Sequence, residues 1–211
     1  MEFRKLRADE IQVRPANKEK TKYLLYQDAR CATNILDETL TPFNWQVKYE
    51  EHKGNLFCYI GVKNTETNEW IWKGDAGSES QVEKEKGEAS DAFKRAAVKW
   101  GIGRELYTAP SIYIPNGDAS KVTSISYTSN GFISSLDIAD NNGNNLFRWV
   151  TPMEQMLINF CKSHKENNPT EWKQKNGNNF FTTFRDSIRE GGIYTLGDLE
   201  VFYGRLSTLH T

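Results

Sequence analysis

Lys94 and Arg95 stand side by side in the segment SDAFKRAAVKWGIG, which covers residues 90–103. Both side chains bind phosphate groups, the lysine as a point charge and the arginine through a planar fork of N–H donors. The same pair also suits the solvated face of a helix, because cations near the C-terminal end complement the helix dipole. Acidic residues precede Phe93 and basic residues follow it, so the order of charges is compatible with either interpretation.

The pattern around this pair predicts a helix over residues 82–100. At about 100° per residue, one arc of the helix is apolar and should be buried: it holds Ala89, Phe93, Ala96, Ala97 and Trp100. Gly101 stands where a left-handed residue commonly ends a helix, and Ile102 would pack back onto the last turn. Lys94, Arg95 and Lys99 lie outside the apolar arc, so we expect them at the surface.

Other elements must hold this helix in place. Strand signals at residues 44–51, 56–63 and 69–74, separated by turns rich in Gly, Asn and Thr, predict an antiparallel meander that the helix covers on one face. An earlier helix is predicted from the spacing of apolar residues, and Pro42 ends it: the residues are Leu25, Ala29, Ala32, Leu36 and Leu40. Most large rings near the sheet should be core, with one or two left to stack on bases: Phe43, Trp45, Tyr49, Tyr59, Trp70 and Trp72.

The second half of the chain changes character at residue 151. Residues 111–150 predict four shorter strands, SIYI, VTSISY, GFISSLDI and NLFRWV. Thr151, Pro152 and Glu154 form a capping-box pattern that opens a helix, and further helices are predicted at 179–190 and after Thr195. The predicted fold class is α+β: an antiparallel β-meander packed on a long amphipathic helix, with a small helical C-terminal appendage. The predicted domains are residues 1–150 and 151–211.

Composition limits the surfaces that the chain can offer. With 27 basic and 28 acidic residues among 211, the net charge is −1, so a nucleic-acid surface must be local or built from several copies. Three widely separated cysteines, Cys31, Cys58 and Cys161, indicate reduced thiols in an interior. No apolar run approaches the roughly 18 residues of a membrane span, and the first residues lack the apolar core of a secretory signal. We therefore expect a soluble protein of the cytoplasm.

Motifs of common catalytic sites are missing. The sequence contains neither GxxxxGK[ST] nor GxSxG, and its three histidines are isolated from other metal-ligating residues: they are His52, His164 and His210. Asp28, Asp37 and Glu38 flank the first predicted helix and leave a metal-dependent nuclease as an alternative. A two-metal site needs acids that converge from several elements, however, and nothing in the sequence selects them. The prediction is a protein without catalytic residues, metal or cofactor.

Longer segments resemble a known family. The segment YQDARCATNILDETLTPFNW, then the meander, then GDAGSESQVEKEKGEASDAFKRAAVKWGIGRELY resemble the Rad-fifty-two superfamily of single-strand annealing proteins. They look closest to its phage branch, the Sak-type recombinases, and the segment EIQVRP fits that branch as well. The resemblance covers residues 8–115, and its most specific part is the acidic-then-basic helix around EASDAFKRA.

This resemblance implies a β-meander packed on the long helix and a homo-oligomeric ring. Single-stranded DNA would run in a basic groove around the ring, with its backbone held inward and its bases exposed, and no nucleotide would be hydrolysed. The family's DNA-contacting pair corresponds to Lys94 and Arg95, its arginine on the first helix to Arg30, and an aromatic residue before the first strand to Phe43. A third basic position of eukaryotic members is Val98 here, and Lys99 follows it as a possible substitute.

The resemblance implies an ATP-independent single-stranded DNA-binding and annealing protein of phage-type recombination and double-strand-break repair, in the cytoplasm of a bacterial host. An alternative is a protein of the same fold that protects DNA ends and does not anneal them. Further partners of residues 151–211 would be a host single-strand-binding protein or a phage exonuclease. In a ring, each copy would contribute one Lys94–Arg95 pair, which reconciles a net charge of −1 with DNA binding.

Overall fold

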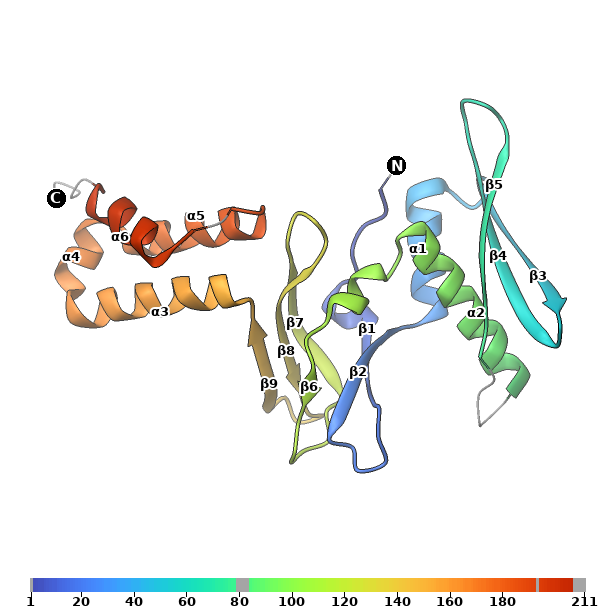
Figure 1. Cartoon of the computed structure of the whole chain (residues 1–211), viewed down its shortest axis with the longest axis horizontal. Helices are drawn as coiled ribbons and strands as arrows, with labels where there is room; N and C mark the ends of the chain where they lie inside the picture. The colour runs from blue at the N-terminus through green and yellow to red at the C-terminus, as the bar shows by residue number, and fades with distance from the viewer. Residues whose placement is uncertain (1, 79–83, 193, 207–211) are drawn as a thin grey trace.

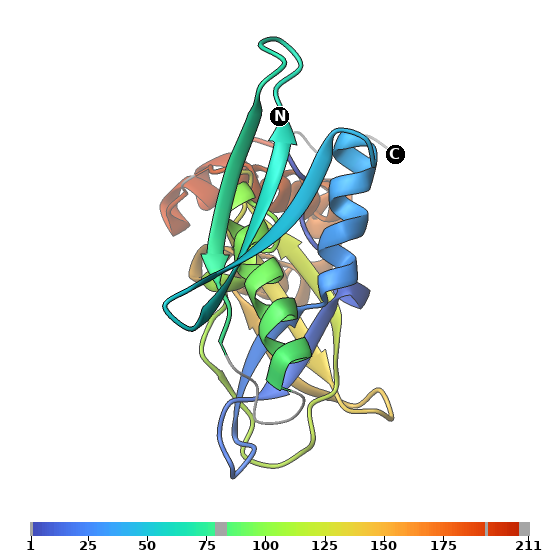
Figure 2. The ribbon, with the colours of Figure 1, turned by 90° about the vertical axis from the view of Figure 1, so that its right-hand side faces the viewer.

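The computed structural model describes residues 2–78, 84–192 and 194–206. These residues build a six-stranded antiparallel sheet, a three-stranded antiparallel sheet and several helices (Figure 1). Helices α1 (Ala29–Leu40) and α2 (Lys84–Trp100) lie between the two sheets. In Figure 2 the three-stranded sheet and α2 face the viewer, and the six-stranded sheet lies behind them. The observed fold is α+β, as predicted.

The three-stranded sheet is the predicted meander. Its strands are β3 (Trp45–His52), β4 (Asn55–Lys63) and β5 (Trp70–Ala76), and α2 packs across β4 and β5. The buried side of α2 holds Ala92, Phe93, Ala96 and Ala97, with Ala89 and Trp100 partly buried. Trp100 Nε1 donates a hydrogen bond to the backbone oxygen of Ile60 at 3.0 Å. The predicted buried face of the helix is therefore confirmed.

The end of α2 also follows the prediction. Gly101 has a φ of 105°, a left-handed conformation that favours glycine. The N–H of Ile102 donates to the backbone oxygen of Ala97 at 3.1 Å, and the Ile102 side chain is fully buried. Residues 82 and 83 of the predicted helix lie outside the described residues.

The six-stranded sheet combines strands from the beginning and from the end of the first 150 residues. Its strand order is β6-β2-β1-β7-β8-β9, and all neighbouring strands are antiparallel. Two short 3-10 helices precede strands of this sheet in the chain: η1 (Ala8–Glu10) comes before β1, and η2 (Arg104–Thr108) comes before β6. The strands are β1 (Ile11–Pro15), β2 (Lys22–Gln27), β6 (Ile112–Tyr113), β7 (Lys121–Tyr127), β8 (Ile133–Ala139) and β9 (Asn145–Val150). The last four match the strands predicted in residues 111–150.

The helix predicted to include Leu25 begins later, so that part of the prediction is wrong. Residues 22–27 form strand β2, in which Tyr23, Leu25 and Gln27 are buried while Leu24 and Tyr26 are exposed. This alternation has the period of a strand. Pairing with β1, a segment with no predicted structure, satisfies the backbone, and a non-local partner of this kind is invisible to local spacing. Asp28 then caps α1 by accepting a hydrogen bond from the N–H of Arg30 at 2.8 Å.

A cluster of ion pairs ties the N-terminal segment to α1. Arg4 contacts Glu10 at 2.7 Å and Glu38 at 2.6 Å, and Arg7 also contacts Glu10, at 2.8 Å. The hydrogen bond from Arg4 is the main reason that the pKa of Glu10 falls to about 2 from a usual 4.5. Because the folded-state pKa is depressed, this carboxylate stabilises the fold above about pH 4.5 and loses that effect as the pH falls toward 2.

We expect Glu10→Gln to lower the free energy of unfolding at pH 7 by about 2–3 kcal/mol. The difference from wild type should shrink below pH 4.5 and vanish near pH 2, where Glu10 itself becomes protonated. Chemical denaturation at several pH values measures this difference. Asp9→Asn is the matched control, because Asp9 is exposed and lies 3.9 Å from Arg7. A difference that stays constant from pH 7 to pH 3 would contradict the prediction.

The C-terminal helices have a core of their own. They are α3 (Pro152–Asn167), α4 (Pro169–Gln174), α5 (Gly177–Arg189) and α6 (Leu196–Gly204), of which α4 was not predicted. Their buried residues share none with the core of the first 150 residues: Leu157, Phe160, Cys161, Trp172, Phe180, Ile188, Leu199 and Tyr203. The division into domains at residue 150 stays a prediction.

The start of α3 departs from the predicted capping box. The side chain of Thr151 accepts a hydrogen bond from the Glu154 N–H at 3.3 Å, as the pattern predicts. The Thr151 N–H, however, donates to the backbone oxygen of Ser134 at 2.9 Å, and the Glu154 carboxylate pairs with Arg189 at 2.7 Å. Only the Thr151 half of the box is therefore formed, because Glu154 instead links α3 to α5. A full capping box occurs at α6, between Thr195 and Asp198.

The three cysteines are free and buried, as predicted. Burial raises the pKa of Cys31 to about 12, of Cys58 to about 11 and of Cys161 to about 12. These thiols are therefore interior side chains with little thiolate character. In the described parts of the chain, no helix combines the length and the apolar character that crossing a membrane requires.

Candidate nucleic-acid interface

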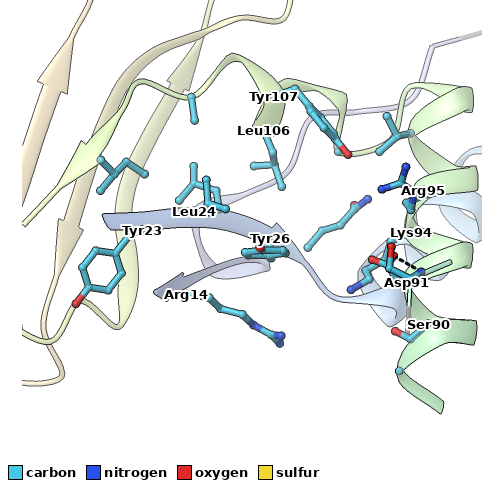
Figure 3. Close-up of a pocket in the computed structure, with 18 of the residues that line it drawn as sticks. Arg14, Tyr23, Leu24, Tyr26, Ser90, Asp91, Lys94, Arg95, Leu106 and Tyr107 are labelled. Atoms are coloured by element: carbon cyan, nitrogen blue, oxygen red, sulfur yellow. Dashed lines mark hydrogen bonds between the residues drawn. The ribbon is translucent and has the colours of Figure 1, made fainter. Parts of the chain in front are cut away.

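A groove of about 890 Å³ runs between β2 and α2 (Figure 3). One wall is a face of α2 with Ser90, Asp91, Lys94, Arg95 and Val98. The opposite wall comes from β1, β2 and the segment after α2, and its residues include Arg14, Leu24, Tyr26, Gln27, Leu106 and Tyr107. The groove therefore lies between the predicted DNA-binding helix and a strand that the sequence did not predict.

The packing of α2 aims the basic pair into this groove. Phe93, Ala96 and Ala97 face the protein core, so Lys94 and Arg95 must point to the open side of the helix. Figure 3 shows both side chains on the groove side of α2, with Tyr26 and Arg14 on the sheet opposite.

A close contact fixes the distance between the two walls. Gln27 at the end of β2 donates through Nε2 to the backbone oxygen of Ile102 at 3.3 Å. A Cβ atom on Gly103 would lie 2.5 Å from the Gln27 side chain, and Gly103 has a φ of 71°. Only glycine meets both conditions, so the segment GIG, expected only to end the helix, also seats α2 against β2.

The groove is positively charged. Its described lining residues include three cations, Arg14, Lys94 and Arg95, and a single carboxylate, Asp91. Asp91 accepts a hydrogen bond from the Ser78 N–H at 3.0 Å, which uses part of its acceptor capacity. Arg95 Nε also lies 3.9 Å from Asp75 on β5, so a carboxylate outside the groove lining offsets part of its charge. A polyanion entering here would meet more positive than negative charge.

The wall formed by β2 adds aromatic and apolar surface. Tyr26 is 37% exposed, Leu24 50% and Tyr107 73%, and all three line the groove. The guanidinium of Arg14 lies 5.6 Å from the centre of the Tyr26 ring and also donates to Gln12. A cationic wall opposite exposed rings can hold a phosphate backbone on one side and contact bases on the other.

The structure brings two of the five predicted site residues together. Lys94 and Arg95 line the groove, whereas the other three do not line it. Lys99 pairs with Asp75 on β5 at 3.3 Å, and Arg30 is exposed at the start of α1. Phe43 is 89% exposed in the loop between α1 and β3. Val98, which the resemblance matched to a third basic position, also lines the groove.

Sequence reasoning missed the residues of the opposite wall. Arg14, Leu24, Tyr26 and Tyr107 line the groove, yet none of them was among the predicted site residues. The sequence contains no clear signal for them, because the apolar run YLLY suits a strand or a helix, and only the structure puts Leu24 and Tyr26 on the exposed face of β2. The same face carries Arg14, which pairs with Leu24 across the ladder.

The carboxylates considered for a nuclease have structural partners. Asp28 caps α1, Asp37 accepts a hydrogen bond from Trp45 Nε1 at 2.7 Å, and Glu38 pairs with Arg4. Within the described residues no group of three His, Cys, Asp or Glu side chains is placed to hold a metal ion.

A basic groove faced by aromatic residues is typical of proteins that bind single-stranded nucleic acid. The chain belongs to the Rad52/22 family of double-strand break repair proteins, because the sequence model of this family matches residues 1–114. It is also similar to the single-stranded DNA-binding protein DdrA of Deinococcus radiodurans, with 34% identity over 114 residues. The alignment covers 50% of this chain and 51% of DdrA, so the chain spans about half the length of that relative. No solved structure matches the chain.

The family assignment confirms the predicted resemblance at the level of the family. Proteins of this family are not enzymes, so the family assignment gives no support to the nuclease alternative. The assignment to the phage branch stays a prediction.

Proposed function

We propose that this protein binds single-stranded DNA in the groove between β2 and α2 and promotes annealing of complementary strands without ATP. The observation that carries the proposal is the position of Lys94 and Arg95, which face the exposed rings of Tyr26 and Tyr107 across one groove. The family, and a relative named as a single-stranded DNA-binding protein, support it.

The proposed mechanism rests on phosphate contacts. Lys94 and Arg95 bind the backbone from α2. Arg14 on β1 supplies a third cation, because the third basic position expected on α2 is Val98 in this chain. Phosphate contacts position a strand without reading its sequence, so the sequence is read by the complementary strand. Arg30, Lys99 and Phe43 lie outside the groove, and in this proposal they contact DNA only where the strand continues beyond it.

The proposal includes a homo-oligomeric ring. A single groove is short and the chain carries a net charge of −1, so one copy offers only a local basic strip. A ring would join the strips into a continuous track, to which a polyanion binds with many contacts at once.

At micromolar concentration we expect light scattering to give a mass several times the 24.3 kDa of one chain, with and without single-stranded DNA. The physical reason is that a continuous track requires several copies. A mass near 24.3 kDa combined with full DNA binding would contradict the ring, while leaving the groove intact.

A second candidate function is protection of DNA ends without annealing. DdrA is named as a single-stranded DNA-binding protein, and strand binding without annealing is what this candidate requires. The test mixes two complementary labelled oligonucleotides with the protein and follows their pairing by fluorescence. Faster pairing supports annealing, whereas nuclease protection of the strands without faster pairing supports the second candidate.

The C-terminal helices are proposed to dock a protein partner, either a host single-strand-binding protein or a phage exonuclease. Their separate core supports this role, since it lets them keep their own surface beside the groove-bearing part. The proposed site of action is the cytoplasm of a bacterial host.

A further inference from the structure

Strand β2 has an open edge beside the groove. On one side, β2 pairs with β1 over residues 23–27. On the other side, β6 pairs only with Lys22 and Tyr23. Among the described residues, no other strand pairs with β2 on this second side. Residues 24–27 therefore form an unpaired stretch of strand, which we call the β2 edge.

A proline explains why β6 pairs no further along β2. The antiparallel register matches Tyr23 with Ile112, so continued pairing would place Pro110 opposite Leu25. Proline has no N–H to donate to a neighbouring strand, and it is found at the edges and ends of sheets. The pairing therefore stops before Pro110, and the segment that leads to β6 borders the groove instead.

Two residues of the β2 edge direct their backbone groups to the open side. The backbone oxygen of Lys22 accepts a hydrogen bond from the β1 side, and that of Thr21 accepts one from the β6 side. Backbone groups alternate between the two sides of a strand, so Leu25 and Gln27 present their N–H and C=O groups to the open side. The described residues supply no backbone partner for these groups. A strand added here would find a donor and an acceptor on each residue.

The chemistry of the groove favours an acidic peptide at this edge. Leu25 and Gln27 line the groove, as do the cations Arg14, Lys94 and Arg95. The DNA backbone has phosphate acceptors but no donors, so it leaves the C=O groups of Leu25 and Gln27 without a partner. An extended peptide carries both donors and acceptors, and addition to an open strand is a recurring way of binding one. Because the groove is positively charged, acidic side chains complement it.

We propose that the groove also binds an extended acidic segment of a partner protein, which adds to β2 as a further strand. Side chains alternate along a strand, so acidic residues two positions apart lie on the same face as Leu24 and Tyr26. Lys94 and Arg95 face these two residues across the groove (Figure 3). Because the segment and a DNA strand use the same cations, the partner displaces DNA. This displacement rests on the proposed DNA-binding function, whereas the binding of the segment does not.

The test uses a short labelled peptide in which glutamate and valine alternate, and measures its binding by fluorescence anisotropy. Lys94→Ala/Arg95→Ala should weaken binding of this peptide on the order of tenfold or more, because two charge-assisted contacts are lost. A peptide with glutamine in place of glutamate should bind equally weakly to the wild-type protein. Lys99→Ala is the matched control and should bind the peptide normally, since Lys99 does not line the groove.

Methylation of the peptide's backbone nitrogens separates strand addition from charge attraction alone. Alternate N–H groups of an added strand point to β2. Methyl groups on one alternating set of nitrogens therefore remove these hydrogen bonds, and affinity should fall on the order of tenfold. Methyl groups on the other set should have little effect. An equal effect of both sets, or no effect of either, would overturn the inference, because charge attraction alone does not depend on the backbone.

A competition experiment keeps this inference apart from the proposed function. The expected result is that the unmethylated peptide displaces labelled oligothymidine. Peptide binding without any binding of oligothymidine would refute the proposed function and leave the inference intact. Binding of oligothymidine without binding of the peptide would overturn the inference, and a second copy of the chain already paired with the β2 edge would give this result. Binding of both without competition would overturn the displacement and place the DNA outside the groove.

Discussion

Replacing both Lys94 and Arg95 by alanine is expected to weaken single-stranded DNA binding on the order of 100-fold, since each loses a charge-assisted contact. The loss should be the same for every DNA sequence, because phosphates carry no base identity. The slope of log affinity against log salt should become shallower by about 0.7 for each phosphate contact removed. Annealing should decrease together with binding.

Folding should be largely unaffected by this double change. Both side chains lie on the open wall of the groove, and the buried side of α2 contains neither of them. If the pair served only to complement the helix dipole, the variant would lose about 1 kcal/mol of stability, and its affinity and salt slope would equal those of wild type. Titrations at three salt concentrations and a melting curve separate these outcomes.

Lys99→Ala is the matched control for this experiment. Lys99 is on the same helix and has the same charge, but its ammonium pairs with Asp75 on β5 at 3.3 Å and does not line the groove. We expect a small change in affinity and little change in the salt slope. A loss as large as that of the double variant would mean that the strand follows the β5 side of α2 instead of the groove.

The sequence allowed one wall of the groove to be predicted in detail. The apolar arc of α2 predicted which residues are buried, so the exposed position of Lys94 and Arg95 followed from spacing alone. Gly101 and Ile102 predicted the end of the helix for the same reason: the cap is a local feature of consecutive residues. The three strands β3, β4 and β5 are neighbours in sequence, and their turns predicted the meander.

The other wall could not be predicted, because long-range pairing forms it. Strand β2 hydrogen-bonds β1 on one side and β6 on the other, and β6 lies about ninety residues further along the chain. Leu25 satisfies a helical spacing as well as a strand alternation, so a short apolar run is ambiguous until its partners are known. Because β2 was predicted as part of a helix, the positions of Tyr26 and Arg14 in the groove wall were not predicted. Position within α2 likewise did not show that Lys99 turns toward Asp75, a residue of another element.

Phe93→Ala is expected to be the most destabilising single change on α2. Its side chain is 6% exposed and belongs to the main hydrophobic core, and its ring centre lies 6.4 Å from that of Trp45. Removing a large buried aromatic side chain leaves a cavity and typically costs about 3–5 kcal/mol. Denaturant titration at neutral pH measures this loss.

The exposed Val47, on the sheet that α2 covers, provides the control. It is 41% exposed on β3, so Val47→Ala should change stability by well under the loss at Phe93. At a temperature where Phe93→Ala is still folded, the variant should bind single-stranded DNA with the wild-type salt slope, since none of the groove cations is altered. The opposite pattern, normal melting with lost binding, would mean that Phe93 faces the DNA. Adjacent residues on a helix are about 100° apart, so Lys94 would then turn away from the groove and the assignment of both faces of α2 would fail together.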